Sequence, residues 1–162
     1  MGIMGTTNPR ILVVDDERQV ADTLAEYLNT LGYEAVPAYN GTEGLARFRE
    51  GDFQLVITDL VMPEMGGMEL LHAIRKLNSD VSVIVLTGFG TIESAVEAIK
   101  GGAYDFITKP YKFEEIELIV ARAMEKDIIF RQMRRFRGLF FFLLFTIPLW
   151  ILLGVLCILF WN

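Results

Sequence analysis

The sequence predicts an α/β domain with a doubly wound parallel sheet, followed by one apolar C-terminal helix. Short apolar runs alternate with helical patterns five times over the first 126 residues, which is typical of βα units. These runs are rich in Val, Ile and Leu, as expected for strands that are covered on both faces. An uncharged run at residues 139–161 then predicts a single long helix outside the domain.

The predicted elements follow one another with short connections. Strands are expected at 10–15, 33–38, 53–59, 81–87 and 104–108, and helices at 17–31, 41–49, 67–77, 91–100 and from 112 onward. Asp16 and Gln19 predict a capping box at the start of the first helix, and glycines at 32, 51 and 101–102 predict helix ends. In the last helix, the spacing of Ile116, Val120 and Ala123 predicts a face that packs on the sheet.

Charge is distributed unevenly along the chain. The 162 residues carry a net charge of −6, but the first 126 hold 11 basic and 20 acidic groups, a net charge of −9. Such an acidic domain repels nucleic acid, so direct DNA binding by this part is not expected. The single cysteine, Cys157, excludes an intrachain disulfide and fits a reducing compartment.

Residues 139–161 contain no charged side chain and are rich in Phe, Leu and Ile. As a helix they would extend about 34 Å, enough for a hydrocarbon core of about 30 Å. A buried core helix is the alternative, but this length without a charge favours a transmembrane helix. Only Asn162 follows, so we expect a tail anchor, and the polar, glycine-rich start of the chain indicates no signal peptide.

Residues 127–138 form the predicted connection to this span. Placed on a helix, their apolar side chains lie on one side and Arg131, Arg134 and Arg135 on the other, which is typical of a basic amphipathic helix. This helix would either lie on the anionic membrane surface or continue into the span as a stalk. Arginines just before the span place the preceding domain in the cytoplasm by the positive-inside rule.

Polar side chains stand where the predicted strands end. They are Asp15 and Asp16 after the first strand, Asp59 at the end of the third, Thr87 at the end of the fourth and Lys109 after the fifth. The carboxyl ends of parallel strands meet at one edge, where open α/β sheets bind ligands. Clustered carboxylates suit a hard cation, and a neighbouring lysine suits a phosphate. Each residue alone is more simply a helix cap, a strand end or a solvated charge, but the joint pattern favours a site.

Four motifs at this edge carry a resemblance to a known family. They are Val13-Val14-Asp15-Asp16-Glu17, Asp59-Leu60-Val61-Met62-Pro63-Glu64-Met65-Gly66-Gly67, Leu86-Thr87-Gly88 and Lys109-Pro110. In this order and spacing, residues 8–126 resemble a response-regulator receiver domain, and the runs 87–90 and 101–106 are most similar to the nitrogen-regulator type. Gly66 departs from the usual pattern without touching the chemistry. The resemblance implies a flavodoxin-like sheet with strand order 2-1-3-4-5.

The resemblance also implies a phosphoacceptor switch that is not an enzyme beyond its own phosphoryl transfer and autodephosphorylation. Asp59 would accept the phosphoryl group. Mg²⁺ would be bound by Asp16, Asp59 and the backbone carbonyl of Val61, with Asp15 acting through a metal-bound water. Lys109 and Thr87 would contact phosphoryl oxygens, and Thr87 with Phe106 would form the conformational switch.

The implied phosphodonor is a histidine kinase or a phosphotransfer protein. Signalling is expected through protein contacts at the membrane, on the face formed by 91–100, 104–108 and 112–126, with a membrane protein or a second copy of the chain as partner. Two alternatives stay open. One is a phosphorylation-independent membrane scaffold, and the other is the remnant of a transcription regulator that lacks its DNA-binding output domain.

Two apolar residues flank the predicted acceptor site. Val61 follows Asp59 by two residues, and Phe89 follows Thr87 by two. Neither side chain is suited to orienting an attacking water molecule. We therefore expect a comparatively long-lived phosphoryl group.

Overall fold

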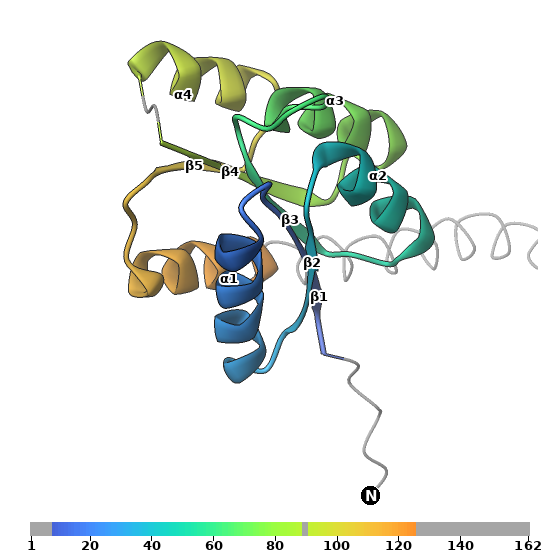
Figure 1. Ribbon diagram of the computed structural model, residues 1–162, viewed down its shortest axis with the longest axis vertical. Coiled ribbons are helices and arrows are strands. Elements are labelled where there is room, and N and C mark those ends of the chain that lie inside the picture. The colour runs from blue at the N-terminus through green and yellow to red at the C-terminus, as the bar shows by residue number, and fades with distance from the viewer. Residues whose placement is uncertain (1–7, 89–90, 126–162) are drawn as a thin grey trace, which may run out of the picture. The chain divides into compact units, whose positions relative to one another are not determined.

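Five parallel strands form one sheet in the order β2-β1-β3-β4-β5, in a computed structural model that describes residues 8–88 and 91–125 (Figure 1). The strands are β1 (Arg10–Val14), β2 (Glu34–Ala38), β3 (Leu55–Asp59), β4 (Ser82–Thr87) and β5 (Asp105–Thr108). The helices between them are α1 (Arg18–Thr30), α2 (Gly41–Glu50), α3 (Gly67–Leu77) and α4 (Ile92–Lys100). A last helix begins at residue 113 and continues to the end of the described segment at 125. The predicted doubly wound sheet and its strand order are confirmed.

The strands direct alternate side chains into two hydrophobic layers. In β1, Ile11 and Val13 belong to one core with α1 and the last helix, whereas Leu12 and Val14 belong to a second core with α2 and α3. Figure 1 shows α1 on one side of the sheet and α2 and α3 on the other. Because both faces are covered, β3 and β4 are buried along their whole length. Even the polar residues that end these strands, Asp59 and Thr87, are buried.

The last helix packs as its sequence pattern predicts. Ile116, Val120 and Ala123 are buried in the same core as α1. Near its start, the Phe113 ring stacks on Tyr27 of α1 with ring centroids 4.5 Å apart. The Tyr27 hydroxyl also donates a hydrogen bond of 2.9 Å to the Glu117 carboxylate. These contacts fix the last helix beside α1.

The predicted capping box of Asp16 and Gln19 is wrong. Helix α1 begins at Arg18, its N-cap is Glu17, and no side chain caps it. The Glu17 amide instead donates to the Asp15 carboxylate at 3.0 Å. Asp16 therefore lies one residue too early to cap the helix. Asp15 and Asp16 both precede the helix, at the carboxyl edge of the sheet.

The helix-ending glycines are confirmed. Gly32 directly follows the C-cap of α1 with φ of +91°, a left-handed conformation that favours glycine. Gly51 and Gly101 are the C-caps of α2 and α4. Gly102 has φ of +97° in the turn that leads into β5.

Within residues 8–88 and 91–125, no helix has both the length and the apolar character needed to cross a membrane. The predicted amphipathic helix at 127–138 and the predicted span at 139–161 lie outside these residues. Both stay predictions from the sequence.

Candidate functional site

The carboxyl ends of β1, β3 and β5 bring two acids and one lysine together. The Lys109 Nζ atom lies 2.7 Å from Asp15 Oδ2 and 2.7 Å from Asp59 Oδ1. Asp15 is 2% exposed and Asp59 is 6% exposed. One ammonium group therefore lies between two buried carboxylates, which we call the Asp15–Lys109–Asp59 cluster.

The parallel sheet itself places these residues. Asp59 is aligned with Leu86 of β4, and Thr87 is aligned with Thr108 of β5. The backbone bonds continue past the strand ends: the Leu60 amide donates to the Leu86 carbonyl and the Lys109 amide to the Thr87 carbonyl, both at 2.7 Å. These bonds fix the backbone on which Asp59, Thr87 and Lys109 stand.

Both carboxylates are oriented by backbone amides as well as by Lys109. The Val61 amide donates to Asp59 Oδ2 at 2.9 Å, and the Glu17 amide donates to Asp15 Oδ1 at 3.0 Å. Close packing holds the Asp59 loop, because a Cβ at Gly67 would collide with the Asp59 carbonyl oxygen. The Gly67 amide donates to the Leu60 carbonyl at 2.9 Å and closes this turn. The Asp59 carboxylate is therefore held in one orientation.

Asp59 and Lys109 respond differently to their surroundings. Burial raises the pKa of the Asp59 carboxyl, the Asp15 charge adds to this, and Lys109 with the Val61 amide opposes it only in part. Burial acts to lower the pKa of the Lys109 ammonium, but the hydrogen bonds and charges of Asp15 and Asp59 outweigh it, so the pKa is raised. The charged partners outweigh burial at Lys109 but not at Asp59, because Lys109 has two anionic partners, whereas Asp59 shares one cation with another acid. With both acids ionised, the cluster keeps one net negative charge.

The remaining predicted site residues lie around this cluster. Thr87 is fully buried at the end of β4, and Phe106 is half-buried on β5 against the core that contains α2 and α3. Asp16 is exposed. Val61, whose amide contacts Asp59, is 59% exposed. Phe89 lies outside the described residues.

The donor set suits a hard divalent cation. Asp15 and Asp59 direct one carboxylate oxygen each at a single positive group, and carboxylate oxygens are the ligands that Mg²⁺ prefers. Within the described ranges, no three acidic, histidine or cysteine side chains converge in the way a protein-only metal site requires. The ligand set of Asp15, Asp16, Asp59 and the Val61 carbonyl stays a prediction.

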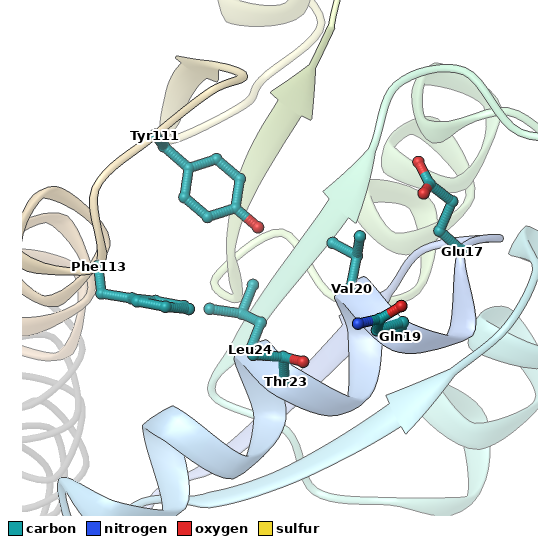
Figure 2. Close-up of a pocket in the computed structure, with 7 residues that line it drawn as sticks. All are labelled: Glu17, Gln19, Val20, Thr23, Leu24, Tyr111 and Phe113. Carbon is teal, nitrogen blue, oxygen red and sulfur yellow. The ribbon is translucent and has the colours of Figure 1, made fainter.

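A pocket beside the site was not predicted from the sequence. Its volume is about 250 Å³, and its lining residues are Glu17, Gln19, Val20, Thr23, Leu24, Tyr111 and Phe113. Figure 2 shows the Tyr111 ring reaching from the segment after β5 toward Val20 and Leu24 of α1. Burial raises the pKa of the Tyr111 hydroxyl, and the nearby carboxylates add to this against the opposing charge of Lys109. Tyr111 lies in the connection after β5 and Phe113 at the first position of the last helix. No periodic pattern marks either residue, so only their aromatic character two and four residues after Lys109 could have drawn attention to them.

An open α/β sheet with a buried, lysine-paired carboxylate at its carboxyl edge defines a class of domain that binds ligands at that edge. The family model for the response regulator receiver domain matches residues 11–121. The chain therefore belongs to the response regulator receiver family. Receiver domains act as phosphoacceptor switches in two-component signalling.

Individual relatives agree with this assignment. The chain is 38% identical over 114 residues to the transcriptional regulatory protein ZraR of Klebsiella oxytoca, covering 70% of this chain and 26% of that one. It is 36% identical over 125 residues to the regulatory protein AtoC of Escherichia coli, covering 77% of this chain and 27% of that one. Among solved structures, a response regulator receiver domain protein from Clostridium thermocellum superposes with a TM-score of 0.72 at 33% identity, covering 75% of this chain and 98% of that one. The chain thus spans about a quarter of the length of these curated relatives.

Proposed function

We propose that this receiver domain accepts a phosphoryl group on Asp59 from the phosphohistidine of a histidine kinase or a phosphotransfer protein. The observation that carries the proposal is the contact of 2.7 Å between Lys109 Nζ and the buried Asp59 carboxylate. A buried anion that is oriented by an amide and paired with a cation suits attack on phosphorus, because position and charge govern phosphoryl transfer.

In the proposed reaction, an Asp59 carboxylate oxygen forms a bond to phosphorus. The bond between phosphorus and the donor histidine nitrogen breaks, and its electron pair stays on that nitrogen. Lys109 stabilises negative charge on the phosphoryl oxygens, and the Thr87 hydroxyl donates to another of them. The product is an acyl phosphate. Water later attacks its phosphorus, the bond to the Asp59 oxygen breaks, and inorganic phosphate leaves as Asp59 returns to the carboxylate.

Asp16, Asp59 and the Val61 carbonyl would hold Mg²⁺, and Asp15 would act through a bound water. The ion would neutralise charge on the transferring group. The net negative charge of the Asp15–Lys109–Asp59 cluster supports this assignment, since a cation that enters there meets an uncompensated carboxylate.

The conformational response is assigned to Thr87 and Phe106. Thr87 lies at the end of β4, and Phe106 of the neighbouring strand β5 is paired with Val85 of β4. Inward movement of Thr87 would open space for the half-buried Phe106 ring. The phosphoryl group shifts such an equilibrium only as far as it binds the two states differently.

The readout surface is assigned to α4, β5 and the last helix. Ile92, Val96 and Ile99 share one side of α4 and are 81%, 44% and 49% exposed. This apolar stripe supports a protein partner or a second copy of the chain as the target. The relative ZraR is a transcriptional regulatory protein by name, but the acidic balance of the first 126 residues argues against DNA contact by the domain itself.

Attachment to the cytoplasmic side of a membrane through 139–161 is also proposed, on the sequence alone. Membrane fractionation with alkaline extraction tests it. The chain should stay with the membrane, and a double substitution Leu152→Arg and Leu153→Arg should release it. Recovery of the unaltered chain in the extract would contradict the attachment.

The phosphoacceptor proposal is tested by incubation with acetyl phosphate and Mg²⁺, followed by intact mass measurement. The chain should gain the mass of one phosphoryl group, and Asp59→Asn should gain none. An unmodified chain would favour the phosphorylation-independent scaffold instead.

A further inference from the structure

Arg75 joins two separate backbone segments at the edge of the sheet opposite the Asp15–Lys109–Asp59 cluster. Its Nε and Nη2 atoms donate to the Gly102 carbonyl at 2.9 and 2.6 Å. Its Nη1 atom donates to the Ser79 carbonyl at 2.8 Å and to the Val81 carbonyl at 2.6 Å. One side chain from the end of α3 therefore ties the turn between α4 and β5 to the segment that enters β4.

The turn that Arg75 holds is closely fitted. Gly102 has φ of +97°, and a Cβ at this position would lie 3.1 Å from Arg75 Nε. The amides that follow are also bonded: Ala103 donates to the Ala98 carbonyl at 2.9 Å and Tyr104 to the Val83 carbonyl at 2.7 Å. The C-terminal end of α4 is thus connected both to α3 and to the sheet.

The rest of α4 is less firmly packed against the domain. Ala98 is its buried residue, near the C-terminal end, whereas Ile92 in the first turn is 81% exposed. The cap at the start of α4 is local, with Thr91 Oγ1 accepting from the Ser94 amide at 3.1 Å. Figure 1 shows α4 beside α3 above the same face of the sheet. In the described part of the chain, the contacts of α4 are therefore concentrated at its C-terminal end.

The two ends of α4 also differ in their relation to the functional site. The first residue of α4, Ile92, comes five positions after Thr87, which ends β4 at the carboxyl edge. The Arg75 contacts lie at the opposite edge, where β4 begins at Ser82 and β5 begins at Asp105. A change at the carboxyl edge would therefore reach the N-terminal end of α4 first.

We propose that Arg75 is a positioning residue that fixes the turn at 101–104 as the pivot of α4, so that rearrangement at the Asp59 site moves the N-terminal turns of the helix about a stationary C-terminal end. The proposed movement of the N-terminal turns of α4 rests on the proposed function, whereas the proposed anchoring of the turn at 101–104 by Arg75 does not. Arginine is required because its planar guanidinium reaches three carbonyls at once, whereas a lysine ammonium is a compact point charge.

Hydrogen exchange followed by mass spectrometry tests the anchor in the 162-residue chain. Arg75→Lys is compared with the unaltered chain and with Lys76→Ala, which removes the neighbouring exposed basic side chain. In Arg75→Lys, amides at 102–104 should exchange at least about tenfold faster, because hydrogen bonds to a charged group hold that turn. Exchange in β1 and α1 should not change, and Lys76→Ala should match the unaltered chain. Unchanged protection at 102–104, or uniform acceleration across β1 and α1, would overturn the anchor.

The pivot is tested by repeating the measurement with acetyl phosphate and Mg²⁺. In the unaltered chain, exchange should change at 91–97 and stay constant at 101–104, whereas in Arg75→Lys the change should extend through the turn. Loss of protection at 101–104 in step with 91–97 in the unaltered chain would overturn the pivot, whether or not Arg75→Lys folds. Intact mass reports phosphoryl uptake separately, so a chain that gains no phosphoryl group refutes the proposed function while the first comparison still decides the anchor.

Discussion

Lys109 Nζ and Asp59 Oδ1 lie 2.7 Å apart, and the same nitrogen lies equally close to Asp15 Oδ2. One cation therefore serves two buried anions that leave different strands of the sheet. The arrangement stabilises Lys109 in its charged form and leaves Asp59 only partly compensated. This is the local condition for a nucleophilic carboxylate that meets a phosphoryl group together with a metal ion.

Replacing Lys109 by Met should impair both stability and chemistry. Two buried carboxylates would face each other without their shared cation, and we expect a loss of about 1–3 kcal/mol, below the value for a fully buried pair because Lys109 is 22% exposed. Phosphoryl uptake should slow by about 10²-fold. Urea unfolding and the rate of mass gain from acetyl phosphate measure the two effects. Lys112→Met, at an exposed neighbouring lysine, is the control, and equal behaviour of the two variants would refute the role of Lys109.

Val61→Asn should shorten the lifetime of the phosphoryl group. Val61 is 59% exposed beside Asp59, and its apolar side chain does not orient water. An amide at this position could position the attacking molecule, so we expect hydrolysis to become several-fold faster. The loss of label from the phosphorylated chain measures this rate, with Val61→Ala as the control for the loss of bulk. If Val61→Asn leaves hydrolysis unchanged, the proposed reason for a long lifetime fails.

Glu43 should give the stability of the domain a measurable pH dependence. Its carboxylate accepts from the Tyr39 amide at 2.9 Å and from Arg47 Nε at 3.0 Å. The Tyr39 bond first, and Arg47 with it, lower the pKa of Glu43 against the opposing effect of burial. The stabilisation is therefore complete above the unfolded pKa, about 4.3, and is lost as pH falls through the lower folded value.

Glu43→Gln should accordingly lose about 0.5–1 kcal/mol at pH 7, and the difference from the unaltered chain should vanish in acid. Urea unfolding across this pH range measures it. Glu26→Gln, at an exposed position on α1, should show no such trend. A constant difference at every pH would contradict the assignment to the Glu43 charge.

Gly67→Ala should disturb the loop that follows Asp59. The added methyl group would meet backbone atoms of Asp59 and Leu60, which cannot move without shifting the Val61 amide that orients Asp59. We expect a loss of about 2 kcal/mol and slower phosphoryl uptake. Gly88→Ala is the matched control for stability, because a Cβ at Gly88 would have no neighbour within 4 Å among the residues that the structure describes. Similar unfolding midpoints for the two variants would refute the steric argument.

The sequence predicted the sheet and the meeting point of its polar residues for one physical reason. Fully buried parallel strands are continuous apolar runs, and their carboxyl ends share one edge. The capping box at Asp16 was predicted wrongly because the Asp15 carboxylate takes the Glu17 amide. That competition depends on the fold around Asp15 and is invisible in the spacing of Asp16 and Gln19.

The carbonyl contacts of Arg75 could not be predicted either. Arg75 and Gly102 are 27 residues apart and meet only because α3 and α4 lie on the same face of the sheet. An arginine near a helix C-terminus is equally compatible with a solvated charge. The pocket lined by Tyr111 and Phe113 likewise depends on how the last helix packs against α1.

The central claim is that Asp59 is the phosphoacceptor, and chemical mapping of the modified residue tests it most directly. After reaction with acetyl phosphate and Mg²⁺, borohydride reduces an acyl phosphate to an alcohol and converts the modified aspartate to homoserine, which peptide mass spectrometry locates. We predict homoserine at position 59, with Asp15 and Asp16 unaltered. Homoserine at either of those positions, or at none of the three after confirmed mass gain, would contradict the account.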